Sequence, residues 1–272
     1  MNPLLKTLIW ILALTLLGQC NKDEPGNVNI PDNTFLNLLI QKGIDTNGDG
    51  AISHQEAAAV RSLNIDNTGV SDLTGIGSFV NLDTLMCGAN WLTSIVLSGN
   101  KHLVFLDCST NQLTSLDVSY NTALAYLACH HNLLANLDVS KNGSLEILRC
   151  YMNELTSLDI SANPELTSLV CLDNNITDLD LSNNIKLEFL DCQHNQITNL
   201  NVVGLNALKT LVCSYNELAS LDISSCTGLQ VLYTVSNKNL PALDLSHNPL
   251  LEEFYCGGQP LLQTLDLSGL VL

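Results

Sequence analysis

Apolar residues in this chain recur at two nested spacings over most of its length. Aligning the sequence with itself gives a regular period, with successive units that begin at Leu82, Leu103, Leu124 and Leu145; the unit at Leu103 reads LVFLDCSTNQLTSLDVSYNTA. Each period holds two LxxLxL runs, and an asparagine follows each run. Alternation of the LxL type is the period of a strand with one face turned inward. Two strands and two turns leave no room for a helix, so the pattern predicts a flattened solenoid with a parallel sheet on each side.

The repeat unit closely resembles the nested bacterial leucine-rich repeat LxxLxLxxNxLxxLDLxxNxx, the IRREKO class, and more distantly the internalin-type arrays of bacterial adhesins. The resemblance covers residues 82–272, with one-residue insertions near Asn239 and Leu262, and residues 63–81 look like degenerate first coils. It implies a mostly β fold, a leucine-rich repeat solenoid of parallel strands. In stacked copies, each repeated asparagine is expected to hydrogen-bond backbone groups along its turn and so to join neighbouring coils.

Cysteines form a column of their own within the repeat. They occupy the same slot of every unit from Cys87 to Cys213, Thr234 takes the next slot, and Cys256 resumes the column. The column replaces an inward leucine, so we expect buried free thiols that act as small apolar groups. Side chains in register point the same way, which is poor geometry for a disulfide. A metal ladder completed by nearby histidines is the alternative, although no CxxC pair is present to start a zinc site.

The two outward faces of the predicted solenoid differ. One is monotonous, because TSLDVS-like segments repeat and place aspartates in one column. Like charges at strand spacing are unfavourable unless they are compensated. Hydrogen bonds from each aspartate to nearby backbone are the simpler expectation, and a ladder of bound cations is the alternative. The aspartates of this column are Asp117, Asp138, Asp159, Asp180 and Asp222.

The other outward face varies from coil to coil and carries five of the six tyrosines. Tyrosine, histidine and arginine on a rigid sheet suit recognition, because they combine a large contact area with a polar tip. The alternative is that exposed aromatic residues merely fit strands well. We expect this face to bind a protein or a glycan. The residues assigned to it are Phe105, Asp107, Tyr126, His130, Arg149, Tyr151, Phe189, Asp191, His194, Tyr215, Tyr233 and Tyr255.

Ahead of the array, residues 45–56 read DTNGDGAISHQE and match the pattern D-x-[DN]-x-[DN]-G-x5-E. This segment resembles the calcium loop of an EF-hand, and residues 32–62 would form an EF-hand-like helical cap. A single loop with three carboxylates predicts weak Ca2+ binding, on the order of 0.1–1 mM, which suits a structural staple better than a switch. A turn without an ion is the alternative. The resemblance implies oxygen ligands from Asp45, Asn47, Asp49, Ala51, Ser53 and Glu56.

The N-terminus has the layout of a secretory signal. One lysine precedes an apolar run from Leu8 to Leu17, and LLGQC then resembles a bacterial lipobox that ends at Cys20. The resemblance implies a lipoprotein signal peptide over residues 1–19, cleavage before Cys20, acylation of that cysteine, and a lipidated tether over residues 20–31. NKDEPG in the tether resembles an export tag for the outer surface, and an ordinary disordered tether is the alternative for this segment. The alternative to the signal peptide is a buried N-terminal helix or an uncleaved anchor. The expected location is the bacterial outer membrane, lipid-anchored at the cell surface.

The C-terminal stretch LSGLVL reads as the start of another strand with no polar cap after it. An open apolar edge invites pairing. We therefore expect either that another chain covers this end or that the sequence is shorter than its natural form.

Net charge and missing motifs exclude several classes of function. The formal net charge of -17 argues against nucleic acid, whose phosphates require clustered Lys and Arg. It also disfavours adsorption to anionic lipid, so the expected membrane contact is through the lipid anchor only. No P-loop, nucleophile elbow, HExxH or dinucleotide fingerprint occurs, so we expect no enzyme. The sequence predicts a surface-anchored, calcium-stabilised protein that binds a macromolecule in adhesion or host interaction. A purely structural envelope lipoprotein is the alternative.

Overall fold

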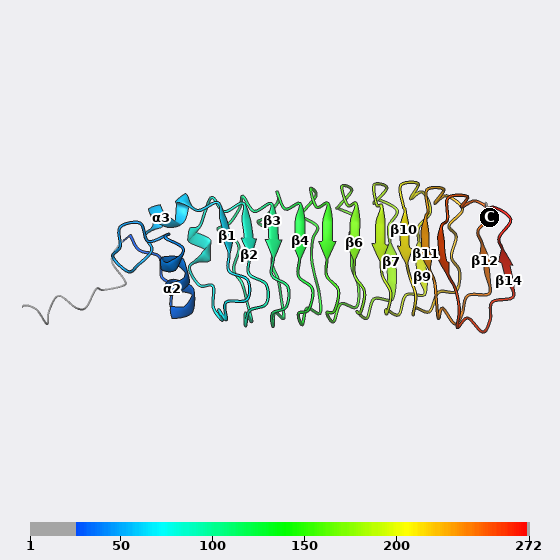
Figure 1. The fold of residues 1–272 in the computed structure, drawn as a ribbon, viewed down its shortest axis with the longest axis horizontal. Coiled ribbons are helices and arrows are strands. Elements are labelled where there is room, and N and C mark those ends of the chain that lie inside the picture. The colour runs from blue at the N-terminus through cyan, green and yellow to red at the C-terminus, as the bar shows by residue number, and fades with distance from the viewer. Residues whose placement is uncertain (1–25, 271–272) are drawn as a thin grey trace, which may run out of the picture.

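The computed structural model describes residues 26–270. In this range the chain winds into an elongated parallel β-solenoid of about 10 turns, with helices at its N-terminal end (Figure 1). The predicted signal peptide, the lipid-acceptor Cys20 and the first residues of the predicted tether lie outside the described range, as do residues 271–272. No helix between residues 26 and 270 is long and apolar enough to cross a membrane.

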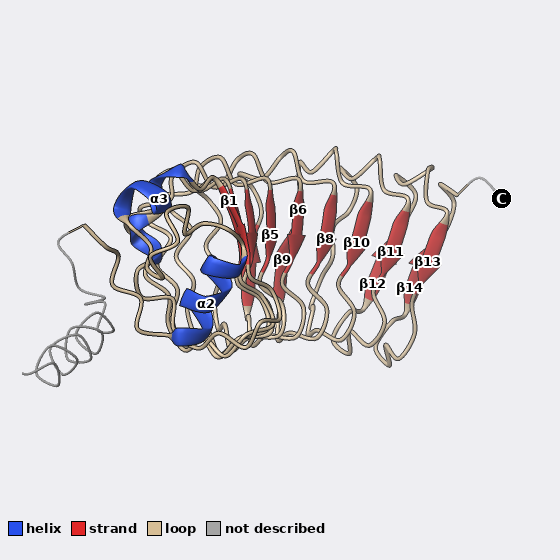
Figure 2. Cartoon of the chain, turned by 60° about the vertical axis from the view of Figure 1, so that its left-hand side comes forward, coloured by secondary structure: helices blue, strands red, loops and turns tan. Residues whose placement is uncertain are grey.

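The main sheet contains ten parallel strands, which follow one another coil by coil along one side of the solenoid (Figure 2). Leu106 of β3 pairs with Leu127 of β4, which pairs with Leu148 of β5, so the period read from the sequence is confirmed. The pairing interval is longer by one at the ends, as between Leu63 and Leu85. The strands are β1 (Ser62–Asn64), β2 (Thr84–Met86), β3 (Phe105–Asp107), β4 (Tyr126–Ala128), β5 (Ile147–Arg149), β6 (Ser168–Val170), β8 (Phe189–Asp191), β10 (Thr210–Val212), β11 (Val231–Tyr233) and β13 (Glu253–Tyr255).

The opposite side of the solenoid carries far less sheet than predicted. Among the described residues it holds two two-stranded sheets, β7 (Asp178–Asp180) with β9 (Asn199–Asn201) and β12 (Ala242–Asp244) with β14 (Thr264–Asp266). A sheet on each side is therefore wrong for most coils. Most of the extended runs on this side end in a turn in which an aspartate accepts the N–H of the residue two positions later. Such a turn engages the aspartate with the local backbone. Four coils pair despite the same kind of turn, and their sequences do not explain the difference.

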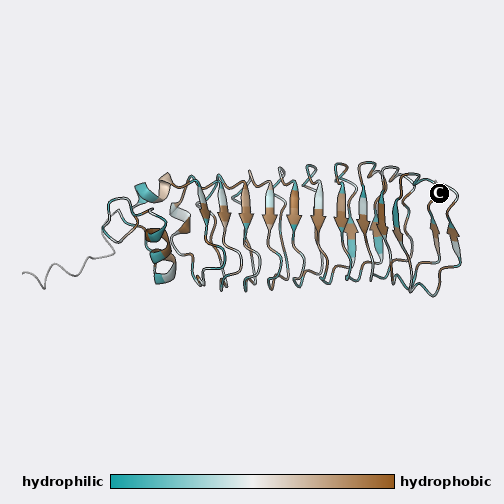
Figure 3. Ribbon diagram, viewed as in Figure 1, coloured by the Kyte–Doolittle hydropathy of each residue, from teal (hydrophilic) through white to brown (hydrophobic). Residues whose placement is uncertain are grey.

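Leucines from both halves of each coil fill the space between the two sides. Leu106, Leu127 and Leu148 of the main sheet are fully buried, and so is Leu113 from the second half of its coil. Figure 3 shows hydrophobic residues recurring in strand after strand of the main sheet. Each coil buries its apolar residues against its neighbours, so the core is one continuous column that runs the length of the array.

Asparagines join the coils at the end of each main-sheet segment, and we call this column ladder one. The amide of Asn132 donates to the carbonyl of Cys108 one coil back at 3.1 Å and to that of Cys129 at 3.0 Å. Its Oδ1 accepts the Leu113 N–H at 2.9 Å. The expected bonding of the repeated asparagines is confirmed. Ladder one consists of Asn90, Asn111, Asn132, Asn153, Asn174, Asn195, Asn216, Asn237 and Gln259.

A second asparagine column, ladder two, lies in the turns after the aspartate side. The amide of Asn142 donates to the carbonyls of Val118 at 3.1 Å and Asn121 at 2.9 Å. Within residues 26–270 its Oδ1 has no hydrogen-bond partner, and the same is true of the other asparagines in the column. Ladder two is therefore only half satisfied. Its members are Asn100, Asn121, Asn142, Asn163, Asn184 and Asn248, with Leu205 and Cys226 in the two remaining slots.

The cysteine column is buried and free. Cys87 to Cys213 are fully buried, and none of the described cysteines forms a disulfide. Burial raises the pKa of these thiols, to about 12 for Cys150 and Cys213. Cys256 is partly exposed near the C-terminal end. The prediction of free thiols that act as core residues is confirmed.

Two helices close the N-terminal end of the solenoid. Asp32 caps α2 (Asn33–Gln41) through Oδ1, and its Oδ2 accepts the Ser71 N–H at 3.0 Å, so it also ties the helix to the first coil. The rings of Phe35 and Phe79 lie 6.5 Å apart, beside the short helix η1 (Ile76–Ser78). The second helix is α3 (His54–Ala59). Helices thus flank residues 45–53, whereas the EF-hand interpretation stays a prediction.

Candidate binding face and calcium loop

The outward side of the main sheet carries a group of aromatic and basic side chains on β3, β4 and β5. The rings of Phe105 and Tyr126 stack with their centroids 4.1 Å apart and their planes 5° apart. Arg149 lies on the next strand, with its Cζ 5.7 Å from the centroid of the Tyr126 ring, within the range of a cation–π contact. Tyr126 therefore has a stacked ring from one neighbouring strand and a guanidinium from the other.

His130 and Tyr151 extend this group beyond the ends of the strands. Their rings stack at 4.2 Å and 13°, and His131 meets both rings edge-on. Burial lowers the pKa of His130, and its Nδ1 has no hydrogen-bond partner among the described residues. The ring is therefore held mainly in the neutral form at neutral pH. We call Phe105, Tyr126, His130, Arg149 and Tyr151 the basic-aromatic cluster.

The two aspartates assigned to the face are engaged within their own turns. Asp107 accepts the hydroxyl of Ser109 at 2.6 Å and its N–H at 3.0 Å. Asp191 accepts the Gln193 N–H at 3.2 Å, and burial raises the pKa of its carboxyl. Both side chains are only partly exposed. The two aspartates stabilise the turns beside the face. Because their carboxylates already accept hydrogen bonds there, fewer acceptor positions remain for a ligand.

The remaining predicted face residues form separate groups toward the C-terminal end. His194 and Tyr215 stack at 4.3 Å and 9°. Tyr233 donates its hydroxyl to Glu253 at 2.7 Å and meets the ring of Tyr255 edge-on at 4.8 Å. The twelve predicted residues therefore share one side of the solenoid but do not form one continuous site.

A shallow depression lies between the basic-aromatic cluster and Phe189. It opens because Ser168 stands in register between the larger Ile147 and Phe189. The sequence analysis did not predict this depression. The small size of Ser168 indicates a depression only when the larger residues beside it on the adjacent strands are known. The residues that line the depression are Arg149, Tyr151, Ser168, Val170, Leu172 and Phe189.

One residue in each coil adopts a left-handed backbone conformation, which sequence reasoning also missed. The position directly precedes ladder one and has φ between 51° and 58° from Asn67 to Ser236. This conformation suits glycine or asparagine and is costly for bulky or β-branched residues. The residues at this position are Asn67, Ala89, Thr110, His131, Met152, Asp173, His194, Tyr215 and Ser236. Two of the predicted face residues, His194 and Tyr215, therefore stand on strained backbone.

The aspartate column on the opposite side is satisfied locally. Asp117 accepts the Ser119 N–H at 2.9 Å, and the hydroxyl and N–H of Ser119 lower the pKa of its carboxyl. Asp138 is bonded to Ser140 in the same way. These contacts agree with the expectation of local hydrogen bonding.

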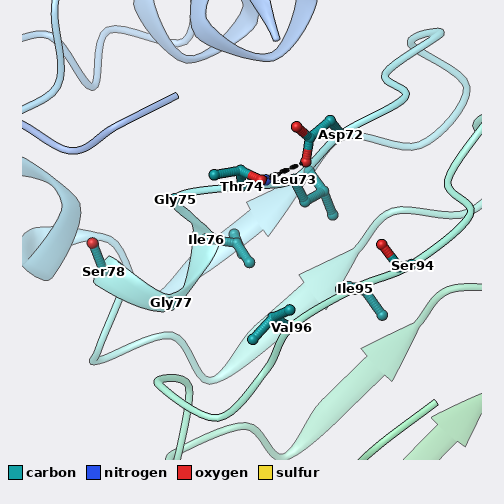
Figure 4. A pocket seen from close by; sticks show the side chains of 10 residues that line it. All are labelled: Asp72, Leu73, Thr74, Gly75, Ile76, Gly77, Ser78, Ser94, Ile95 and Val96. Carbon is teal, nitrogen blue, oxygen red and sulfur yellow. Dashed lines mark hydrogen bonds between the residues drawn. The ribbon is translucent and has the colours of Figure 1, made fainter. Parts of the chain in front are cut away.

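A groove near the cap lies on the same side as the aspartate column, between residues 72–78 and 94–96 (Figure 4). Val96 occupies the aspartate position of its coil, one period before Asp117. The N–H and the hydroxyl of Thr74 both donate to Oδ1 of Asp72 at 2.7 Å, within one turn. The groove therefore lacks the convergent polar groups expected of a binding site.

The predicted calcium loop is wound by hydrogen bonds between its own residues. Asp45 accepts N–H groups from Gly48 at 2.8 Å and Gly50 at 3.0 Å, and both glycines have positive φ. Asn47 accepts the Asp49 N–H at 2.8 Å, and Asp49 in turn accepts the N–H two residues on. Each carboxylate or amide oxygen keeps further lone pairs. Carboxylate and amide oxygens are the ligand types that a hard cation such as Ca2+ prefers.

Glu56, the last residue of the loop, faces the loop backbone. Its Oε1 accepts from the hydroxyl and N–H of Thr46, both at 2.7 Å, and its Oε2 accepts the Ser53 N–H at 2.9 Å. These bonds lower the pKa of Glu56 to about 2. Residues 26–270 contain no cluster of three or more His, Cys, Asp or Glu placed to hold a metal. A bidentate role for Glu56 would require it to share its bonds to Thr46 and Ser53 with the ion.

Comparisons with known proteins place this geometry in context. No protein-family model and no curated protein sequence matches the chain. A leucine-rich repeat protein of Leptospira interrogans is 25% identical over 80% of this chain and 74% of that one, with a TM-score of 0.61. Internalin C2 of Listeria monocytogenes is 18% identical over 86% and 97%, with a TM-score of 0.59.

A further solved structure is the functional domain of InlJ from Listeria monocytogenes, described as including a cysteine ladder. It is 31% identical over 82% of this chain, with a TM-score of 0.49, and this chain spans 66% of its length. The Leptospira and internalin C2 structures share the architecture built from the register above. This architecture is commonly used for protein binding and is typically a scaffold without enzymatic activity. The ten-strand register and these two structures together show that the chain has the parallel solenoid fold of leucine-rich repeat proteins.

Proposed function

We propose that this protein is a surface-anchored leucine-rich repeat protein that binds a macromolecular partner, in adhesion or host interaction, through the outward side of its main sheet. The observation that carries the proposal is the basic-aromatic cluster. It gathers five large polar-tipped or aromatic side chains on three adjacent coils along the main sheet, whereas the aspartate side repeats one locally satisfied turn. Aromatic residues and arginine dominate the energetics of protein interfaces.

The proposal is tested with a fourfold variant in which Tyr126, His130, Arg149 and Tyr151 are replaced by alanine. The wild-type chain and the variant are screened against the same arrays of proteins and glycans. We expect the variant to lose the ligands that the wild type retains. A control with Asp117→Asn and Asp138→Asn alters the opposite side and should retain them. Equal retention by wild type and fourfold variant would leave a purely structural role in the envelope as the better account.

Within this proposal, Ca2+ holds the N-terminal cap in shape and is not a signal. Support comes from the wound loop with its row of oxygen donors and from Asp32, which joins α2 to the first coil. Since the first coil would have an unpaired edge without the helices, a cap that stays folded protects this coil. The proposed affinity is on the order of 0.1–1 mM, in the range of extracellular calcium modules.

Surface anchoring is proposed on the lipobox-like LGQC that ends at Cys20. Acylation of this cysteine would tether the solenoid to the outer membrane through a lipid and not through a spanning helix. Labelling of cells with a fatty-acid analogue tests this directly. The wild-type chain should carry the label and Cys20→Ser should not; label on the Cys20→Ser chain would argue for a different attachment.

A further inference from the structure

We infer that the basic-aromatic cluster binds the carboxylate of an acidic peptide segment of a partner protein, with a neighbouring apolar side chain of that segment in the depression beside Ser168. The inference rests on the proposed function, because it names the chemistry of the ligand for the same face. Three observations support the inference: Arg149 has no ion-pair partner among the described residues, the aromatic rings of the cluster stack on one another, and a depression lies beside them.

Arg149 is an exposed cation that forms no ion pair with a carboxylate of residues 26–270. The ion pairs among the described residues use other cations, namely Arg61, Lys186 and Lys209. Arg149 is also the only basic residue within the ten strands of the main sheet. Its register neighbours are Ala128 and Val170, so neither adjacent strand offers it a carboxylate. Arg149 is therefore a local positive charge on a chain whose net charge is -17, and its planar guanidinium suits a carboxylate from outside the chain.

The surroundings of Arg149 favour a planar carboxylate. Stacking against Tyr126 holds the guanidinium beside the ring, which reduces the entropy lost when it forms paired hydrogen bonds. Tyr126 and Tyr151 add phenolic hydroxyl groups that can donate to the same anion. A carboxylate accepts two parallel N–H bonds from arginine, which is among the stronger hydrogen-bonded contacts in proteins.

The ring orientations favour a peptide over a glycan. A sugar binds an aromatic residue by lying on the face of the ring, so it needs an open face. Phe105 covers one face of Tyr126 and Arg149 lies over its ring, while His130 and Tyr151 cover one face of each other. These contacts occupy the Tyr126 ring from both neighbouring strands and cover one face each of Phe105, His130 and Tyr151, so fewer ring faces are left for a sugar. Ring edges carry partial positive charge, which suits carboxylate and carbonyl oxygens of a peptide.

The depression provides the second part of the site. Arg149 pairs in register with Val170, which lines the depression with Leu172 and Phe189. Ser168 leaves room there because both of its register neighbours are larger. An apolar side chain that enters this space removes apolar area from water, at about 25 cal/mol per Å². The expected ligand segment therefore carries Asp or Glu close to an apolar residue.

The test screens the full chain against an array of short random-sequence peptides and an array of glycans that includes sialylated and uronic-acid sugars. Three variants accompany the wild type. Arg149→Gln removes the charge, Ser168→Trp fills the depression, and Lys209→Gln is the control, because Lys209 is an exposed cation already paired with Glu188 at 2.6 Å. Thermal melts confirm that each variant is folded.

We expect the wild type to retain peptides in which an acidic residue lies near an apolar one. Arg149→Gln should weaken these peptides by at least about tenfold, Ser168→Trp should remove the apolar preference, and Lys209→Gln should bind as the wild type does. Peptides retained without an acidic preference, or held equally by Arg149→Gln, would overturn the inference and leave the proposed function standing. Retention of acidic glycans alone would overturn the peptide assignment. If no ligand distinguishes the wild type from the fourfold variant, the proposed function fails with the inference.

Discussion

The backbone N–H of Leu113 donates to Oδ1 of Asn132, one coil further on, at 2.9 Å. The amide of the same side chain donates back to the carbonyl of Cys108, so one buried residue satisfies donors and acceptors of two coils. Removal of a buried partner leaves each orphaned group with a cost of about 1–3 kcal/mol. We therefore expect Asn132→Leu to lower the free energy of unfolding by about 3 kcal/mol or more in urea denaturation.

Ladder two supplies the matched control for this prediction. Asn142 is equally buried, but its Oδ1 is unpartnered in the described residues, and the chain itself has Leu205 at an equivalent slot. Asn142→Leu should thus cost clearly less than Asn132→Leu. Equal losses for the two variants would contradict the distinction between a satisfied and a half-satisfied ladder.

Thr110 is a β-branched residue held at φ 53°. A left-handed conformation costs such residues about 1–2 kcal/mol, and asparagine tolerates it better. Thr110→Asn should therefore stabilise the protein by about 1 kcal/mol, measured as a rise in melting temperature. Thr114→Asn is the control, because Thr114 is exposed in the same coil and is absent from the positive-φ positions. A gain of the same size in the control would point to an effect of asparagine itself.

The buried cysteine column predicts sensitivity to alkali. Burial raises the thiol pKa from 9.0 to about 12 at Cys150 and Cys213. A pKa raised on folding contributes stability that is present below the unfolded value and is lost as the pH rises through the folded value. The free energy of unfolding should therefore fall between about pH 9 and pH 12.

Single cysteine variants locate this effect. Cys150→Ala should be less stable at neutral pH because it leaves a cavity, yet its stability should fall less steeply above pH 9. Cys256→Ala replaces a partly exposed thiol and should leave the slope nearly unchanged. An identical slope in all three proteins, measured by urea denaturation at a series of pH values, would assign the alkaline loss to other groups.

Removal of Ca2+ should loosen the cap. We expect EDTA to lower the melting temperature of the wild-type chain, and Ca2+ in the millimolar range to restore it. Glu56→Gln should lose the response because its side chain no longer binds bidentately. Asp117→Asn alters a carboxylate far from the loop and should keep it. A wild-type melt unchanged by EDTA would remove calcium from the proposed function.

Much of this fold follows from the repeat, since a pattern copied coil after coil predicts the same contacts each time. The inward leucines, the buried cysteine column and the bonding of Asn132 all follow from LxxLxLxxN and its period. The second sheet does not follow, because LxL alternation indicates which side chains point inward but not whether the backbones of adjacent coils approach. The turn between Asp117 and Ser119 does not decide this, because the same turn follows Asp180 in a coil that does pair.

The binding face was predictable in part. Outward positions follow from strand alternation, so Tyr126 and Arg149 could be placed on one side. That Phe105 covers a face of Tyr126 depends on the choice of rotamers between strands, and the space at Ser168 depends on its two register neighbours. The backbone strain at Tyr215 carries no sequence signal, because the same position holds Ala, Thr, Met and Asp in other coils.

The constant interval between paired strands has a consequence for how such a chain can change over generations. Deleting or duplicating one whole period within the regular coils would restore each hydrogen bond of both ladders, since each coil touches only its neighbours. The length of the array can therefore vary in whole steps without a new core. A step made between the cap and β5 moves Arg149 and its neighbours relative to the cap by one strand, so the distance from the cap to this face changes in units of the strand spacing.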